Sequence, residues 1–191
     1  APPFAHAAAG ADVSVVEVVM GLYAGRLGLT EGRSGFGSSS HIAELIDAQV
    51  VLVMDTSGVS RTLAATAYGL ANHLQAPKVA GVILNKTGSP RAVDELRGAL
   101  AEVGLPVLGA IPRSRDLVVP SRHLGLVPAA ERDQAQAVID AAAELVAAHV
   151  DLDEVLAVAS AAAELDVTPW SAQAEISTVG GRPRIAVAAG R

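Results

Sequence analysis

Four short apolar runs, separated by segments with helical patterns, constrain the fold of this chain more than any other feature. The runs occupy residues 13–20, 50–55, 79–84 and 106–112. Each is continuously apolar rather than alternating, which is typical of strands covered on both faces in a parallel sheet. Strands that alternate with helices imply right-handed crossovers. The pattern therefore predicts an α/β fold with a doubly wound, mainly parallel sheet.

Helix signals lie between and after these runs. Small polar residues stand where first turns would begin, and they favour helix starts because their side chains accept hydrogen bonds from free backbone N–H groups. These residues are Ser60, Ser89 before Pro90, and Asp151 before Glu154. Apolar residues also share one face over residues 135–150, as in an amphipathic helix.

The pattern changes after residue 164. Residues 165–183 contain the single Trp, two prolines and a Gly-Gly pair, which is typical of a linker. Residues 184–191 resemble the beginning of one more strand. We therefore expect one domain over residues 1–164, a linker over 165–183 and the start of a second, truncated domain over 184–191.

Composition excludes several classes of function. The 191 residues contain no Cys, which excludes disulfides and thiolate metal sites and fits a reducing cytoplasm. The formal net charge is -6 without a basic block, so nucleic acids and anionic membranes are poor candidate partners. No apolar run approaches the roughly 20 residues that a membrane-spanning helix needs. Aromatic residues make up only 3%, so Ala, Val, Leu and Ile must form the core.

Polar or Gly-rich segments follow the four apolar runs. Ligands of open α/β sheets bind beyond the carboxyl ends of the strands, so these segments are the candidate binding loops. They are residues 20–26, 55–58, 85–89 and 111–113, with Glu17 just ahead of the first. A carboxylate inside an apolar strand is costly unless it is paired or binds a cation. Glu17 thus either pairs with an Arg or reaches solvent, or serves a metal or phosphate site that suits Mg²⁺.

Short motifs leave the chemistry open. The chain has no G-x-x-x-x-G-K-[ST] phosphate loop, no G-x-G-x-x-G and no G-x-S-x-G. The segment GSSSHIAELI (residues 37–46) places three serines ahead of an apolar helix. Those serines are either a plain N-cap or an anion site, because a helix N-terminus carries free N–H groups.

Taken in order, the motifs resemble one known family. VVEVVMGLYAGR, GSSSHIAELI, VVLVMDTSGVSRT, GVILNKTGSPR and LPVLGAIPRSRDLVVPSRHLGLVPAAE are similar to segments of the cobyrinate and hydrogenobyrinate a,c-diamide synthases. The resemblance covers residues 4–156 and resumes at RPRIAVA (residues 182–188). It implies an incomplete P-loop NTPase-like fold, similar to dethiobiotin synthetase.

This resemblance implies an ATP- and glutamine-dependent amidation in cobalamin biosynthesis. ATP and Mg²⁺ would activate the a and c carboxylates of a corrin precursor as acyl phosphates. Ammonia derived from glutamine would then displace phosphate, and the site must hold two anions together. A corrin precursor and that ammonia are the expected partners, with a homodimer as an open option. Nucleic acid and membrane are not expected as partners.

The resemblance also implies roles for particular residues. Glu17 matches a strand-end glutamate expected near Mg²⁺ and the activated carboxylate, as a catalytic and metal residue. Asn85 matches the asparagine that binds the nucleotide base, and Pro112 and Arg113 match the loop beside that base. The residues expected to bind the corrin substrate are Tyr23, Ser38, Ser39, Ser40, Arg122 and His123.

Two departures from the family bear on activity. Val18 stands where the family usually has Gly, and Ala24 stands where it has Asp. The phosphate loop and the glutaminase cysteine of the family are also absent from these 191 residues. We therefore expect this chain to be inactive by itself. The alternatives are an amidotransferase similar to cobyric acid synthase, and a non-catalytic MinD-like ATPase remnant that acts as a binding module.

Overall fold

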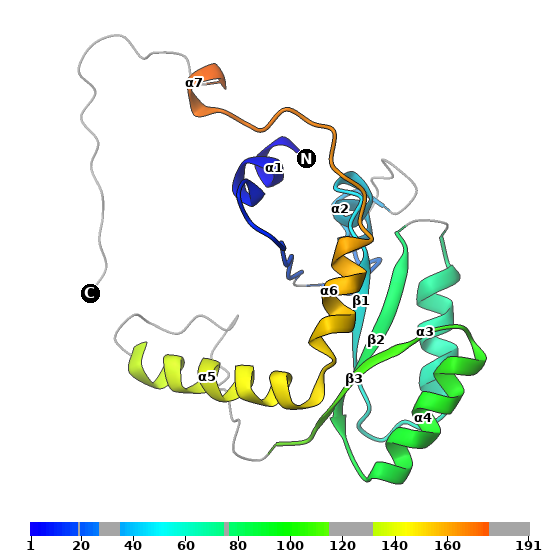
Figure 1. Ribbon diagram of the computed structural model, residues 1–191. Coiled ribbons are helices and arrows are strands. Elements are labelled where there is room, and N and C mark those ends of the chain that lie inside the picture. Colours follow the sequence, from blue (N-terminus) through cyan, green and yellow to red (C-terminus); the bar gives the residue numbers. More distant parts are fainter. Residues whose placement is uncertain (19, 27–34, 75–76, 115–131, 176–191) are drawn as a thin grey trace.

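A computed structural model describes residues 1–18, 20–26, 35–74, 77–114 and 132–175 (Figure 1). Three parallel strands form its sheet in the order β1 (Val50–Asp55), β2 (Val79–Thr87), β3 (Val107–Pro112). These strands confirm three of the four that the apolar runs predict. The register pairs Asp55 with Asn85 and Thr87 with Pro112, so all three strands end at one edge of the sheet.

The fourth predicted strand, residues 13–20, is wrong. Residues 13–18 form no strand and are exposed, with Val15 retaining 90% of its accessible surface. In Figure 1 this segment leads away from α1 (Pro2–Ala8) without joining the sheet. A strand needs a neighbouring edge as well as an apolar sequence, and no pairing of residues 13–18 is found in the described part of the chain.

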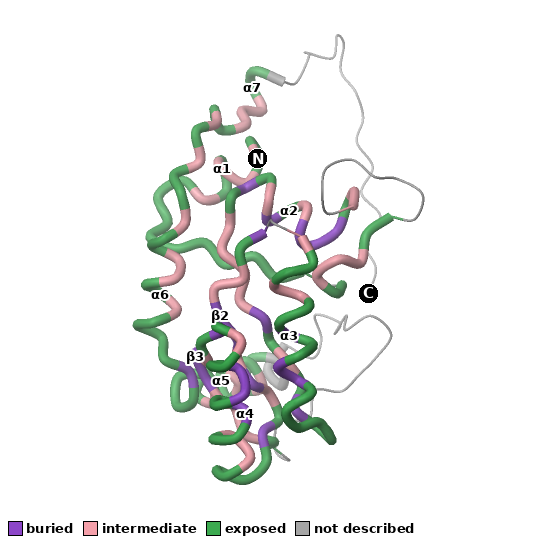
Figure 2. Tube along the Cα trace, turned by 90° about the vertical axis from the view of Figure 1, so that its right-hand side faces the viewer, coloured by how far each residue is buried: buried purple, intermediate pink, exposed green. Residues whose placement is uncertain are grey.

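Two helices cover one face of the sheet. α3 (Thr62–Asn72) follows β1, and α4 (Pro90–Glu102) follows β2. The core between these helices and the sheet is aliphatic, as the composition requires, and its most buried stretches are purple in Figure 2. It includes Leu52, Leu63, Ala67, Val82, Leu84, Leu96, Ala99 and Leu100. Burial of these side chains supplies the main stabilisation of this half of the fold.

On the opposite face of the sheet, two of the described helices contact β3. α5 (Arg132–His149) and α6 (Leu152–Ser160) meet at Val150, which forms an antiparallel bridge with Gly109. The Asp151 N–H donates to the Leu108 carbonyl at 2.8 Å. A β-carbon at Gly109 would lie 2.8 Å from the Val150 Cα, so this contact requires glycine. On the same face Val53 of β1 is 63% exposed.

The capping predictions are partly confirmed. Ser89 accepts the Ala92 N–H at the start of α4, and Asp151 accepts the Glu154 N–H at the start of α6. Ser60 does not cap α3, because its hydroxyl donates to a carboxylate oxygen of Glu95 instead.

Two shorter helices complete the described fold. α2 (Ser39–Leu45) precedes β1, and α7 (Ala172–Glu175) follows an extended segment. Within that segment, part of the predicted linker, the Trp170 ring contacts His6 of α1 edge-on at 5.7 Å. Residues 176–191 lie outside the described residues, so the domain boundaries stay predictions. Among the described helices, none combines the length and apolar character needed to cross a bilayer.

Candidate functional site

The carboxyl edge of the sheet brings together the residues predicted to bind a nucleotide. Asn85 lies near the end of the central strand β2, while Pro112 and Arg113 lie at the end of β3. The Arg113 N–H donates to the Thr87 carbonyl at 3.1 Å, which joins the two strand ends. The sequence-based expectation that these three residues share one edge is therefore met, and their role stays a prediction.

The Asn85 side chain has a defined orientation. Its Oδ1 atom accepts the Lys86 N–H at 2.8 Å. Lys86 has a positive φ of 55°, a left-handed conformation that is unusual for a residue with a β-carbon. Asn85 as a whole residue is half-buried, so part of it is exposed to solvent.

Thr56 holds the loop after β1 against the backbone of β2. Its N–H donates to the Asn85 carbonyl at 2.9 Å. Its hydroxyl lies 3.1 Å from both the Asn85 and the Lys86 carbonyl oxygens and can donate to either. Thr56 is buried at 8% exposure, so these hydrogen bonds form away from competing water.

An ion pair joins the same two strands at the surface. The Lys86 Nζ atom lies 2.6 Å from Asp55 Oδ2, and both side chains are about half exposed. The hydrogen bond from Lys86, followed by those from Ser57, holds the pKa of the Asp55 carboxyl well below its usual value. Since solvent screens exposed pairs, this contact fixes geometry more than it adds stability.

Arg113 connects the two outer strands. Its Nη2 atom donates to the Ser57 hydroxyl at 2.5 Å. Because β2 lies between β1 and β3, this hydrogen bond spans the carboxyl end of the central strand. The carboxyl ends of the strands thus present the amide of Asn85, the Lys86–Asp55 ion pair and the guanidinium of Arg113. An amide suits a purine base, and a guanidinium suits an anion.

Tyr23 lies toward the amino ends of the strands, at the opposite end of the sheet from Asn85. Its hydroxyl donates to the Leu70 carbonyl at 2.7 Å, and its ring contacts His73 edge-on at 4.9 Å. Leu70 belongs to the last turn of α3, which runs back from the carboxyl edge toward the amino edge. Burial raises the pKa of the Tyr23 phenol.

The three serines of residues 38–40 lie near Tyr23, away from Asn85. Ser38 caps α2 by accepting the His41 N–H at 3.1 Å, as the plain N-cap interpretation predicts. Ser39 donates to the Met20 carbonyl at 3.2 Å, and the Ser40 hydroxyl lies 3.2 Å from that of Ser38. These contacts join α2 to residues 20–26. The described structure thus does not assemble Tyr23 and the serines with the nucleotide-binding candidates, and their substrate role stays a prediction.

Glu17 is exposed and lies outside the sheet, so it is not the buried strand carboxylate that the sequence suggested. Within the described ranges, no three His, Asp or Glu side chains come together as a metal-binding group. Since Mg²⁺ is usually bound by one or two carboxylates together with the phosphates of a nucleotide, its role beside Glu17 stays a prediction. Arg122 and His123 lie outside the described residues.

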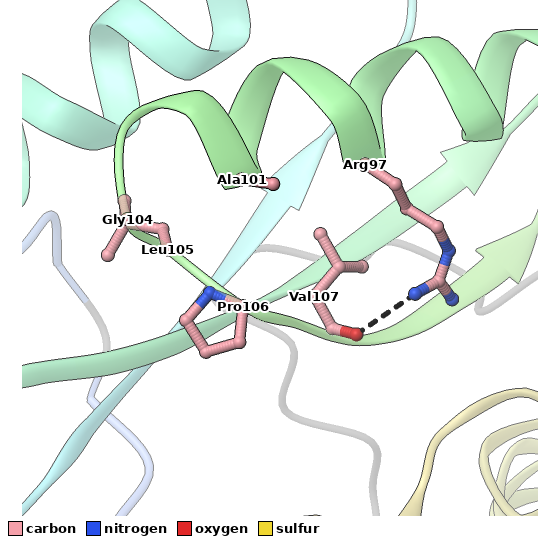
Figure 3. A pocket seen from close by; sticks show the side chains of 6 residues that line it. All are labelled: Arg97, Ala101, Gly104, Leu105, Pro106 and Val107. Carbon is pink, nitrogen blue, oxygen red and sulfur yellow. Dashed lines mark hydrogen bonds between the residues drawn. The ribbon is translucent and has the colours of Figure 1, made fainter.

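A shallow pocket lies apart from the strand-end site, between α4 and the start of β3 (Figure 3). Its lining consists of Arg97, Ala101, Gly104, Leu105, Pro106 and Val107. Arg97 donates one N–H of its guanidinium to the Val107 carbonyl at 3.1 Å. We assign no function to this pocket.

Sequence reasoning marked residues 55–58 and 85–89 as candidate loops but missed the individual contacts of Thr56, Ser57 and Lys86. The only local signal was a polar Asp-Thr-Ser sequence directly after an apolar run. Its contacts depend on the register between β1 and β2, which the sequence of one strand does not contain.

Three curated proteins that share one name are similar to most of this chain. The chain is 50% identical over 173 residues to the hydrogenobyrinate a,c-diamide synthase of Thermobifida fusca, covering 91% of this chain and 36% of that protein. The protein of that name from Mycobacterium bovis is 42% identical over 192 residues, covering 100% and 42% respectively. The Rhodobacter capsulatus protein of that name is 48% identical over 164 residues, covering 86% and 37%. The chain therefore spans well under half the length of these curated relatives.

No solved structure gives a significant match to the chain. A family model described as an AAA domain matches residues 25–121, just over half of the chain. That range contains all three strands and the edge at which Asn85, Pro112 and Arg113 meet. The chain belongs to this AAA domain family, and it is similar to the hydrogenobyrinate a,c-diamide synthases.

Proposed function

We propose that this chain is part of the ATP-binding region of an enzyme that amidates the a and c carboxylates of hydrogenobyrinate or cobyrinate. The observation that carries the proposal is the meeting of Asn85, Pro112 and Arg113 at the carboxyl edge of the sheet. Ligands of open α/β sheets bind at this edge. The names of the relatives add the substrate class and do not favour the alternatives of a cobyric acid synthase or a remnant binding module.

In this proposal Asn85 binds the adenine base and Arg113 lies beside the nucleotide. The bound ATP serves to convert a corrin carboxylate into an acyl phosphate, and ammonia replaces the phosphate. Glutamine is the proposed source of that ammonia, and Mg²⁺ is the proposed companion of ATP. We also propose that the enzyme is located in the cytoplasm and does not bind membranes. Whether it forms a homodimer is left open.

Nucleotide binding provides the first test. ATP is titrated into the chain and into Asn85→Ala, with Asn72→Ala as the matched control because Asn72 is an exposed residue of α3. We expect the Asn85 variant to bind ATP about tenfold more weakly, the effect of losing about 1.4 kcal/mol of hydrogen bonding. The control should bind as the unsubstituted chain does. Equal affinity in all three proteins would overturn the assignment of Asn85.

An amidation assay tests the rest. The chain is incubated with hydrogenobyrinate, ATP, Mg²⁺ and glutamine, and amide products are sought by mass spectrometry. We expect none, because residues 1–191 contain no phosphate-loop motif and no cysteine. Amide formation by the chain alone would overturn the proposed inactivity while supporting the proposed reaction.

A further inference from the structure

The orientation of the Asn85 amide depends on a strained neighbour. The Lys86 N–H points at Asn85 Oδ1 while Lys86 adopts a φ of 55°. This hydrogen bond fixes the amide plane through one lone pair of Oδ1. The second lone pair of Oδ1 and the two Nδ2 donors have no partner among the described residues, so they are available to a ligand.

A left-handed residue with a β-carbon costs roughly 1–2 kcal/mol and persists only where its surroundings enforce it. The last residue of β1, Asp55, and the first residue after it, Thr56, do so here. Thr56 lies with its hydroxyl 3.1 Å from the carbonyls on both sides of the strained position, those of Asn85 and Lys86. Asp55 holds the far end of the Lys86 side chain at 2.6 Å. The backbone of Lys86 is thus held by Thr56 and its side chain by Asp55.

We propose that Thr56 and Asp55 are positioning residues that set the Asn85 amide for recognition of an adenine base. The proposal rests on the proposed function, in which Asn85 binds that base. Neither residue needs to touch the nucleotide. Thr56 is buried, and its hydroxyl is directed to the backbone of the next strand.

The expected consequence is selectivity as well as affinity. An asparagine amide pairs with adenine by accepting from the 6-amino group and donating to N7. Hypoxanthine carries a 6-oxo group in place of the amine, so it cannot donate to Oδ1. A correctly oriented Asn85 should therefore prefer ATP to inosine triphosphate, and a rotated amide should lose that preference.

The test compares Thr56→Val with Thr56→Ser. Valine has nearly the shape of threonine but no hydroxyl, whereas serine keeps the hydroxyl. Thr66→Val is the matched control, because Thr66 lies exposed on α3 and bonds only within that helix. ATP and inosine triphosphate are titrated into each 191-residue protein, and binding is followed by NMR together with the Asn85 side-chain NH₂ resonance.

We expect Thr56→Val to weaken ATP binding about tenfold, equivalent to about 1.4 kcal/mol, and to reduce the preference for ATP over inosine triphosphate. Its Asn85 NH₂ resonance should move in the absence of nucleotide. Thr56→Ser should restore most of the affinity and the preference, and Thr66→Val should change neither. A purely structural role would lower the melting temperature without altering the ratio of the two affinities.

A second pair of variants covers the case in which Thr56→Val does not fold. Asp55→Asn removes the charge that holds Lys86, and Glu102→Gln is its control because it removes the comparable exposed ion pair with Arg61. We expect Asp55→Asn, and not Glu102→Gln, to reduce the preference for ATP by about two- to threefold, a loss in the range of exposed ion pairs.

The outcomes separate the two proposals. If the unsubstituted chain binds no ATP, or Asn85→Ala binds it equally well, the proposed function fails and this inference fails with it. If Asn85→Ala loses affinity while Thr56→Val and Asp55→Asn keep both affinity and preference, only the positioning role is overturned.

Discussion

The contact between Gly109 and Val150 supports a direct test of how α5 and α6 meet the sheet. In Gly109→Ala the new methyl group would lie 2.8 Å from the Val150 Cα and Cγ2 atoms and 2.9 Å from the His149 carbonyl oxygen. Two of these three neighbours are backbone atoms, so a side-chain rotation cannot relieve the overlap. We expect the corner between α5 and α6 to move and the bridge to β3 to weaken.

Overpacking of this kind costs roughly 1–3 kcal/mol, and the backbone contacts place Gly109→Ala in the upper half of that range, about 2–3 kcal/mol. For a chain of this length that loss lowers the melting temperature by roughly 4–12 °C. Thermal and urea unfolding followed by circular dichroism measure the change. Hydrogen exchange at the Asp151 amide, which donates to the Leu108 carbonyl at 2.8 Å, should speed up in the variant.

Gly98→Ala is the matched control. Gly98 lies within α4, and a β-carbon there would meet nothing within 4 Å. Alanine should stabilise this helix by roughly 0.5–1 kcal/mol, because it loses less backbone entropy on folding than glycine. If Gly109→Ala were as harmless as Gly98→Ala, the reasoning about the α5–α6 corner would be refuted.

Three further predictions concern the core and the titrating groups. Leu100→Ala, at a core position with 0% exposure, should cost about 2–5 kcal/mol in urea unfolding, whereas Leu45→Ala, at 49% exposure, should cost much less; similar losses would contradict the assigned core. In an NMR titration the Asp55 carboxyl should have a pKa below its unfolded value of about 3.9, and a normal midpoint would argue against its pairing with Lys86. The stabilisation from that pairing should be present above about pH 4 and should be lost as the pH falls through the lowered pKa. Tyr23→Phe should lower the free energy of unfolding by about 1 kcal/mol, because it removes the hydrogen bond to the end of α3. Burial should raise the pKa of the Tyr23 phenol above 10 in an ultraviolet titration, and an unshifted phenol would contradict that burial.

The sheet illustrates what local sequence can predict and what it cannot. Residues 50–55, 79–84 and 106–112 were correctly predicted as strands, because continuous β-branched and aliphatic runs suit a covered parallel sheet. Residues 13–18 are also rich in valine but do not form a strand in the described structure. Whether such a segment becomes a strand depends on distant parts of the chain, since a strand forms only where it can pair with a neighbouring strand.

The helix starts show the same limit. Asp151 and Ser89 cap their helices as predicted, because a cap needs only its own first turn. Ser60 stands at an equivalent place before α3 but turns its hydroxyl to Glu95 of α4. A partner from another helix therefore outcompetes the local cap, and the local sequence does not reveal that partner.

The candidate site was half predictable. The rule that ligands bind at carboxyl ends of parallel strands correctly grouped Asn85, Pro112 and Arg113. The same rule, applied to the predicted strand over residues 13–20, placed Glu17 at that edge, and this failed with the strand. The part played by Thr56 emerges only from the register that sets β1 beside β2.

Mapping of ATP binding by ¹H–¹⁵N NMR tests the central claim most directly, because the two groups of candidate residues lie at different edges of the sheet. We expect ATP-dependent shifts at residues 55–57, 85–87 and 113, and their loss in Asn85→Ala. Shifts confined to residues 22–26 and 38–41, or no shift at millimolar ATP, would contradict it.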